Sequence, residues 1–359
     1  MRPATLADWL AYVETLHPKS IALGLDRVAS VAQRMSIGIG CPVITVGGTN
    51  GKGSTCAMLE AIYRHAGFRT GLYTSPHLLR FNERVRILGA EASDAALAAA
   101  FDAVESARIS GAAAGECAAS VASRDAAAAA GAIPLTYFEF STLAALALFA
   151  RARLDVLVLE VGLGGRLDAV NLVDADVAVI TTVGIDHIDY LGSTRDAIGR
   201  EKAGIFRMGR RAVCGEPNPP RSLTDYAQSI GAPLWQVGRD YAYAAEGAQW
   251  RYRGPGGALY GLPVPALRGE YQLGNAATAL AAIDALRERL PVPAGAVRDG
   301  LVHVELPGRL QSLPGRPAVV LDVAHNPHAA RGGNPGRCDP PVRRHCARIR
   351  RRAFGCERD

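Results

Sequence analysis

No run of eighteen apolar, uncharged residues occurs in this chain of 359 residues, so the sequence predicts no transmembrane helix. Residues 1–27 also lack the apolar core of a signal peptide, and we expect a cytoplasmic protein. The seven cysteines are an odd number at scattered spacings, and none forms a Cys-x-x-Cys pair, so we expect reduced thiols and no zinc site. The sequence has neither a nucleophile elbow nor a Cys and His dyad, and it therefore does not predict covalent nucleophilic catalysis.

A surplus of charge is also missing from most of the chain. The formal net charge is +6, and residues 331–359, with nine Arg against three Asp or Glu, account for all of it. Residues 1–330 hold 31 charges of each sign. A neutral body of this kind does not favour nucleic acid or acidic membranes, so we expect neither as a partner.

Two segments show little of the periodicity that predicts secondary structure. Residues 331–359 are rich in Arg, Pro, Gly and Cys, so we expect a basic, disordered tail. One hypothesis is that this tail is an out-of-frame translation, which resequencing the coding region would test; the alternative is a natural basic extension. Residues 106–132 are rich in Ala, Gly and Ser and are expected to be a helical or flexible insertion without a chemical role.

Four glycines and a lysine lie in Gly47–Thr55, the most informative stretch of the sequence. Residues 42–46 before it are apolar and β-branched, as in a strand, and residues 57–63 after it have helical spacing. The amides of such a loop bind phosphate, Lys52 would reach the outer phosphates, and a hydroxyl of Ser54 or Thr55 would bind Mg²⁺. The spacing departs from a strict Walker A loop, because Gly53 follows Lys52. The alternative interpretation is a glycine-rich connector.

Two further apolar segments predict buried parallel strands, and polar residues follow each. Glu160 lies at the carboxyl end of residues 154–161, where open α/β sheets bind ligands, and Asp186 and His187 follow residues 177–182. We expect a helix over 142–150 and another that begins at Glu201. Residues 218–268 predict strands and turns rather than helices.

Longer motifs resemble a known family. Residues 48–54, Gly-Thr-Asn-Gly-Lys-Gly-Ser, resemble the ATP loop of the Mur ligase superfamily, and Gly53 resembles the folate branch, folylpolyglutamate synthase and dihydrofolate synthase. Further matching segments lie at 75–78, 80–85, 135–140, 160–169, 272–280, 306–309 and 319–328. The resemblance covers nearly all of residues 5–330. It implies an α/β fold, in which a P-loop-type central domain has a mostly parallel sheet flanked by helices and a small β-rich part, followed by the start of a Rossmann-like C-terminal domain.

The domains implied by this resemblance are a central ATP-binding domain at 1–300, which includes an N-terminal substrate-binding helix, and the beginning of the C-terminal ligase domain at 301–330. The tail at 331–359 follows. The strand expected at 319–323 would lack its usual neighbours, so its edge should be exposed.

The implied reaction is the ATP-dependent addition of L-glutamate to dihydropteroate and to folates through an acyl phosphate. The implied cofactors are ATP and Mg²⁺ at two sites, with K⁺ as a further candidate, and a monomer is expected. Two alternatives stay open. The chain could be a truncated fragment that keeps nucleotide or pterin binding, or a Mur ligase that joins an amino acid to a cell-wall precursor.

The resemblance also assigns roles to residues. The catalytic residues are Lys52, His187 and a carbamylated Lys202. The Mg²⁺ ligands are Ser54, Ser75 and Glu160 at the first site, with His187 and Lys202 near the second. The nucleotide is expected to contact Asn50, Gly51, Lys52, Gly53, Ser54, Thr55, Asn275, Arg309, Asp322 and His325. The acceptor substrate is expected to contact Leu23, Gly24, Leu25, Asp26, Ser75, His77, Thr136, Tyr137, Phe138, Glu139, Leu167, Asp168 and Ala169. Ala22 departs from the family, which commonly has Asp there.

Overall fold

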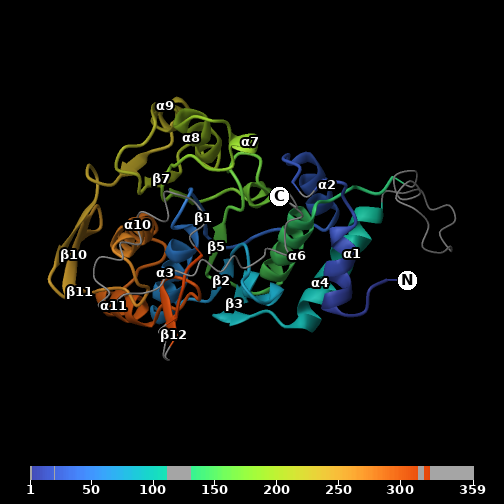
Figure 1. The fold of residues 1–359 in the computed structure, drawn as a ribbon, viewed down its shortest axis with the longest axis horizontal. Coiled ribbons are helices and arrows are strands. Elements are labelled where there is room, and N and C mark those ends of the chain that lie inside the picture. The colour runs from blue at the N-terminus through green and yellow to red at the C-terminus, as the bar shows by residue number, and fades with distance from the viewer. Residues whose placement is uncertain (1, 20, 111–130, 314–318, 324–359) are drawn as a thin grey trace.

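A central sheet of eight strands organises the molecule (Figure 1). The computed structural model describes residues 2–19, 21–110, 131–313 and 319–323. The spatial order of the strands is β4-β3-β2-β5-β1-β6-β7-β8. Their bounds are β1 Val43–Gly47, β2 Thr70–Tyr73, β3 Val85–Ile87, β4 Ala90–Glu91, β5 Val156–Glu160, β6 Val177–Ile180, β7 Arg211–Cys214 and β8 Leu234–Gln236.

The register of the sheet decides where the functional loops meet. Strands β2, β5, β1, β6, β7 and β8 run parallel, whereas β3 and β4 are antiparallel additions at one edge. Val46 lies beside Glu160, and Gly47 lies beside Ile180. The carboxyl ends of β1, β5 and β6 are therefore level, and the loops that follow them share one edge of the sheet, where α/β proteins bind ligands.

Helices cover both faces of this sheet, because its central strands are apolar on both sides. One face packs against α1 Leu6–Glu14, α2 Asp26–Arg34, α4 Asp94–Ile109, α6 Tyr137–Arg151, α8 Arg195–Ala203 and α9 Arg221–Ser229. The other packs against α3 Lys52–His65, α10 Tyr271–Ala285 and α11 Ala294–His303. The short helices are η1 Phe81–Arg84, η2 Ala169–Leu172 and α7 Ile188–Leu191. This α/β architecture confirms the predicted fold class.

Two small antiparallel sheets lie outside the central one. The first has the order β11-β10-β9, with bounds β9 Ala242–Glu246, β10 Gln249–Gly254 and β11 Gly257–Pro263. It is the β-rich part that composition predicted. The second pairs β12 Gln311–Leu313 with β13 Val319–Leu321. The β13 residues are 38–44% exposed.

Three predictions about helices were wrong: two misplaced the start of a helix, and one expected no helix. Helix α6 begins at Tyr137 rather than Thr142, because Thr136 caps it with Glu139 in a capping box. Glu201 lies near the end of α8 and does not begin a helix, since α8 is capped by Thr194 and ends before Gly204. Helix α9 lies within 218–268, where only strands and turns were expected; Pro220 precedes it, and its buried Leu223 and Ala227 are four residues apart.

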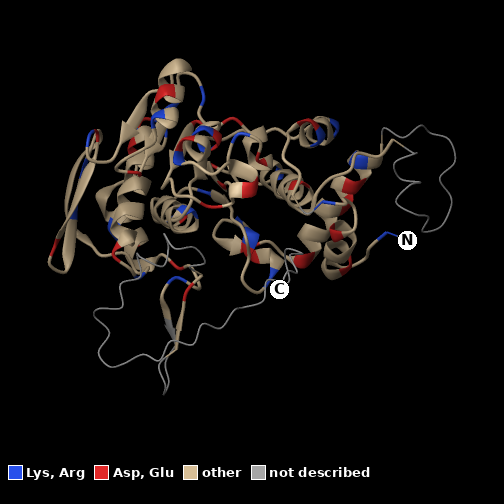
Figure 2. Ribbon diagram, turned by 45° about the horizontal axis from the view of Figure 1, so that its top comes forward, with Lys and Arg blue, Asp and Glu red and all other residues tan. Residues whose placement is uncertain are grey.

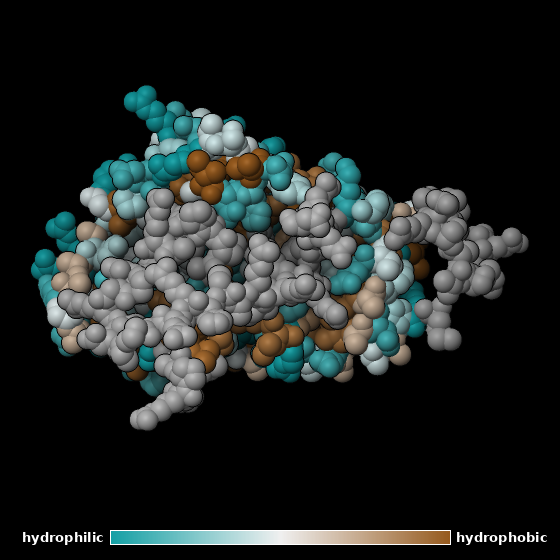
Figure 3. Space-filling view, viewed as in Figure 1, coloured by the Kyte–Doolittle hydropathy of each residue, from teal (hydrophilic) through white to brown (hydrophobic). Residues whose placement is uncertain are grey.

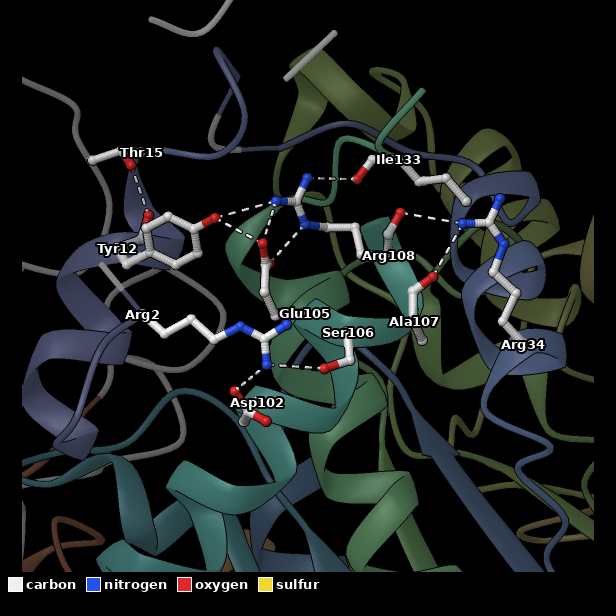
Figure 4. A network of polar contacts seen from close by, with 10 residues as sticks. All are labelled: Arg2, Tyr12, Thr15, Arg34, Asp102, Glu105, Ser106, Ala107, Arg108 and Ile133. Atoms are coloured by element: carbon white, nitrogen blue, oxygen red, sulfur yellow. Dashed lines mark hydrogen bonds and ion pairs between the residues drawn. The ribbon is translucent and has the colours of Figure 1, made fainter. Parts of the chain in front are cut away.

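A network of polar contacts joins α1, α2 and α4 (Figure 4). The buried Arg108 donates to Glu105 at 2.7 and 2.8 Å, and the Tyr12 hydroxyl donates to the same carboxylate at 2.9 Å. Arg108 Nη1 also donates to the Ile133 carbonyl at 3.3 Å. Arg34 Nη1 donates to two carbonyls of the last turn of α4. These bonds tie together residues on both sides of 111–130, most of the predicted insertion, which lies outside the described residues.

The described surface is mixed in character. Acidic and basic residues alternate along the ribbon in Figure 2. On the visible part of the face in Figure 3, hydrophobic residues form small groups among hydrophilic ones. No helix in the described ranges is both long and apolar enough to cross a membrane.

Candidate active site at the carboxyl edge of the sheet

The glycine-rich loop joins β1 directly to α3, as the sequence predicted. Gly51 has φ +84° and precedes the first residue of α3, so the free amides at this helix start point into the loop. A Cβ on Gly51 would collide with the Asn275 side chain, and one on Gly48, at φ +144°, would collide with Thr181. The loop can therefore adopt this path only with glycine at both positions.

Lys52 folds back over the loop. Its Nζ donates to the carbonyls of Gly48 and Thr49 at 3.0 and 3.2 Å. This places the ammonium group above the anion-binding backbone, where the phosphates of a nucleotide would meet it. The Thr55 hydroxyl is buried and has no hydrogen-bond partner among the described residues, whereas the buried Ser54 hydroxyl accepts a bond from Gln272 at 3.3 Å.

Two threonines after β6 hold the loop from the side. Thr181 Oγ1 donates to the Asn50 carbonyl at 2.6 Å, and the Asn50 amide donates to Thr182 Oγ1 at 3.0 Å. Thr49 exchanges two further bonds with Gly184. The segment that leads to Asp186 and His187 is thus joined to the phosphate loop, which the level strand ends make possible.

Glu160 lies beside the loop and is 4% exposed. Its Oε2 accepts a bond from the Ser75 amide at 3.1 Å, which brings together the residues predicted to hold the first Mg²⁺. A Cβ on Gly53 would lie 3.7 Å from both Glu160 oxygens and 3.2 Å from Arg309 Nη2. Burial raises the pKa of Glu160, while the charges of Lys52 and Arg309 act in the opposite direction.

Lys202 is 3% exposed and lies at the end of α8. Burial, together with the charge of Lys52, lowers the pKa of its amine to about 7, while Asp186 and Asp168 act in the opposite direction. A Cβ on Gly165 would lie 2.9 Å from the carbonyls of both Glu201 and Lys202, so the glycine loop after β5 and the end of α8 pack in close contact. A neutral buried amine is the form that can react with CO₂.

The other residues predicted to contact the nucleotide or the metal lie in different places. Asn275 reaches the loop from α10, and its Nδ2 donates to Gln272 Oε1 at 2.9 Å. Asp322 is exposed and accepts a bond from the Leu310 amide, next to Arg309. His187 is exposed, with φ +51°, just before α7. His325 lies outside the described residues.

The aromatic segment predicted to contact the acceptor forms the first turn of α6. Tyr137 and Phe138 are half-buried, and the Phe138 ring lies against Gly162. Thr136 and Glu139 are buried and bond to one another as the helix cap. Glu139 also forms an ion pair with Arg27 at 2.7 Å, so its carboxylate joins α6 to α2. The same Arg27 donates to the carbonyl of Ala22.

The remaining predicted acceptor residues lie on neighbouring loops. The Gly24 amide donates to the Leu167 carbonyl at 3.4 Å, which brings the loop 23–26 to the loop that contains Leu167 and Ala169. Asp168 is buried and accepts bonds from the amides of Leu163 and Val170, and burial raises its pKa to about 6. His77 is half-buried and accepts a bond from Arg84 Nε at 2.8 Å.

The sequence prediction missed several residues of this site. Thr181 and Thr182 follow an apolar strand, which is a usable signal for a ligand edge. Gln272 has no such signal, because its contact with Ser54 joins residues more than 200 positions apart. Asn171 is also buried, and its Nδ2 bridges the carbonyls of Arg166 and Gly204. That bridge could be found only from the packing of η2 against the end of α8.

The fold and the loop together define a Mur-type ligase domain, and comparison with known proteins agrees. The Mur ligase middle domain matches residues 128–283. Dihydrofolate synthase/folylpolyglutamate synthase of Escherichia coli strain K12 is 48% identical over 326 residues, which cover 90% of this chain and 71% of that protein.

Solved structures agree with this match. E. coli FolC in complex with DHPP and ADP superposes with a TM-score of 0.81 at 48% identity, over 92% of this chain and 73% of that one. A bifunctional folylpolyglutamate synthase/dihydrofolate synthase with Mn, AMPPNP and L-glutamate bound has a TM-score of 0.79 at 47% identity, over 92% and 74% of the two chains. The chain belongs to the dihydrofolate synthase/folylpolyglutamate synthase family.

Proposed function

We propose that this chain is an ATP-dependent amide ligase that adds L-glutamate to dihydropteroate and to folates. The observation that carries the proposal is the meeting of Lys52, Glu160 and Lys202 at one edge of the sheet in a member of this family. The acceptor carboxylate attacks the γ-phosphorus of ATP, the bond to ADP breaks, and an acyl phosphate forms. The glutamate amine then attacks the acyl carbon, loses a proton and displaces phosphate.

The protein's own contribution is positioning and charge. Lys52 and the loop amides bind the phosphates, and Arg309 adds a second cation beside Gly53. Thr181 and Thr182 fix the path of the loop. These groups act on developing negative charge, so no covalent enzyme intermediate is needed.

The donor atoms at the edge fit a divalent metal. Ser54, Ser75 and Glu160 offer hydroxyl and carboxylate oxygens, which hard cations such as Mg²⁺ prefer, and a carbamylated Lys202 would add a further oxygen donor. In the described ranges no group of three or more His, Cys, Asp or Glu forms a metal site, so phosphate oxygens would have to complete the coordination. A bound metal would neutralise phosphate charge during transfer.

Release of ADP by the purified protein tests the proposal. With ATP, Mg²⁺ and dihydropteroate, ADP release should depend on added L-glutamate, and the glutamylated product should appear in equal amount. A folded protein that binds ATP but shows no glutamate-dependent release would contradict ligase activity. Replacing dihydropteroate with a cell-wall precursor in the same assay tests the other Mur ligase class.

We also propose that the protein acts as a cytoplasmic monomer on small molecules. Cys41, Cys56 and Cys214, the cysteines within the described ranges, are free thiols, which supports a reducing compartment. Light scattering at working concentration tests the oligomeric state.

A further inference from the structure

Arg84 is a buried cation that is not among the predicted site residues. Its residue exposure is 2%, and it ranks among the largest fully buried side chains. The guanidinium lies 5.6 Å from the Phe81 ring centroid and 5.5 Å from that of Tyr137. Its Nε donates to His77 Nδ1 at 2.8 Å. Within the described residues, no carboxylate lies at ion-pair distance from it.

An arrangement of this kind is costly without a further partner. Arginine stays charged at all ordinary pH values and has five N–H donors, of which the bond to His77 uses one and a contact with the Tyr73 hydroxyl uses another. The ring faces of Phe81 and Tyr137 compensate part of the charge, as cation–π contacts do. A buried charge is otherwise paired with an anion, because its desolvation is not recovered by neutral contacts alone. The environment of Arg84 therefore suits an anion that is not part of the protein.

The position of Arg84 indicates which anion this is. On one side it touches Tyr137, in the aromatic first turn of α6. On the other it bonds to His77, two residues after Ser75, whose amide contacts Glu160. The positive charge of Arg84 acts on the carboxyl of Glu160 and opposes the rise in its pKa. The guanidinium thus lies between the aromatic residues for the acceptor's rings and the residues for phosphate transfer.

We propose that Arg84 binds the carboxylate of the acceptor substrate and remains on the same oxygens while they become the acyl phosphate. This inference rests on the proposed function. The two N–H groups at the end of a guanidinium match the two oxygens of a carboxylate, whereas lysine would offer a single point charge. No proton moves to or from Arg84; it places the attacking oxygen and offsets its charge until ADP leaves.

A comparison of two ligands on two proteins isolates this contact. Calorimetry would measure binding of dihydropteroate and of the same pterin–aniline without its carboxylate, to the unsubstituted protein and to Arg84→Met. The unsubstituted protein should prefer the carboxylate ligand by roughly ten- to a hundredfold, as for a hydrogen-bonded charged pair. In Arg84→Met this preference should fall to about twofold, because only the carboxylate ligand loses a contact.

Arg80→Met is the matched control. Arg80 lies four residues earlier, is 67% exposed and pairs with Glu91, so its loss should leave the preference unchanged. If Arg84→Met weakens both ligands equally, Arg84 has a packing role and the inference is wrong. Should Arg84→Met fail to fold by circular dichroism, Arg84→Lys decides: a preference reduced at least threefold supports the inference, and an unchanged one overturns it. If the unsubstituted protein binds neither pterin ligand, the proposed function fails instead.

Discussion

Lys202 shows how burial, with a neighbouring positive charge, changes what a side chain can do. It is one of three lysines in the chain, with Lys19 and Lys52. Its amine is enclosed at the end of α8, which lowers its pKa to about 7. A protonated amine cannot attack CO₂, and a neutral one can. The carbamate predicted for this residue should therefore form as the pH rises through 7.

We expect a carbon-13 carbamate signal from protein in labelled bicarbonate to be at least roughly tenfold stronger at pH 8 than at pH 6, because the neutral fraction of the amine rises about tenfold and carbamate formation also releases a proton. Nuclear magnetic resonance measures it directly. Lys202→Met should remove the signal, and Lys19→Met should leave it. A signal that survives Lys202→Met would contradict the assignment.

Gly51 provides a second prediction at the residue scale, with Gly67 as its control. The two lie before and after α3 at φ +84° and +88°, but a Cβ on Gly67 meets open space and one on Gly51 meets Asn275. Gly67→Ala should cost about 1–2 kcal/mol in the free energy of unfolding because of the left-handed backbone, and Gly51→Ala should cost more because its Cβ also collides with Asn275. Only Gly51→Ala should also weaken ATP binding, by at least roughly tenfold.

Urea unfolding and nucleotide titration of the two variants measure these effects. Equal ATP affinities for Gly51→Ala and Gly67→Ala would show that the close approach of Asn275 does not shape the nucleotide site.

Helix α6 is the element that places the aromatic residues proposed to contact the acceptor. Its first turn contains Tyr137 and Phe138, and the cap formed by Thr136 and Glu139 sets where that turn begins. Arg27 holds the cap from α2 through its pair with Glu139. The geometry of the proposed acceptor site thus depends on where a helix starts as well as on the side chains of Tyr137 and Phe138.

Thr136→Ala should cost about 1 kcal/mol of stability, the usual value for a lost N-cap, and should weaken dihydropteroate binding. Ser93→Ala removes the equivalent cap of α4, where Ser93 accepts a bond from Ala96. It should cost similar stability and leave binding unchanged. Thermal unfolding measures the stability of both variants, and calorimetry measures their binding of dihydropteroate. Equal binding by the two would mean that the cap of α6 has no influence on the site.

At the scale of the whole molecule, the net charge and the predicted binding residues belong to different parts of the chain. Residues 1–330 are neutral overall, and residues 331–359 contribute the full +6. The described residues predicted to bind nucleotide or acceptor lie between positions 23 and 322, and residues 331–359 lie outside the described ranges. The charge of residues 331–359 should determine solubility and non-specific adsorption, and the residues at the carboxyl edge of the sheet should determine nucleotide affinity.

Removal of residues 331–359 should abolish retention on a cation-exchange column at neutral pH and leave ATP affinity unchanged within about twofold. A loss of ATP binding in the shortened protein would show that the tail supports the fold or the site. Replacing the nine tail arginines with serine at full length provides the control for chain length.

Much of the site follows from local sequence. The strand, glycine loop and helix around Lys52 were predicted, because strand propensity, glycine and helical spacing act over a few residues. Glu160 was placed at a strand end for the same reason, and the mostly parallel sheet was implied by the family resemblance. The start of α6 was missed, since the capping box at Thr136 overrides the aromatic content of the turn that follows.

The sequence by itself determined the chemistry available here: a phosphate loop, oxygen donors after parallel strands, and a neutral body with a basic tail. Only the tertiary structure decided how these groups act together. It buried Lys202 so that the pKa of its amine falls to about 7, joined Gln272 to Ser54, and enclosed Arg84 between two rings with no carboxylate of the described residues at ion-pair distance. Burial and long-range contact depend on the packing of elements far apart in the chain, and no short sequence pattern contains that information.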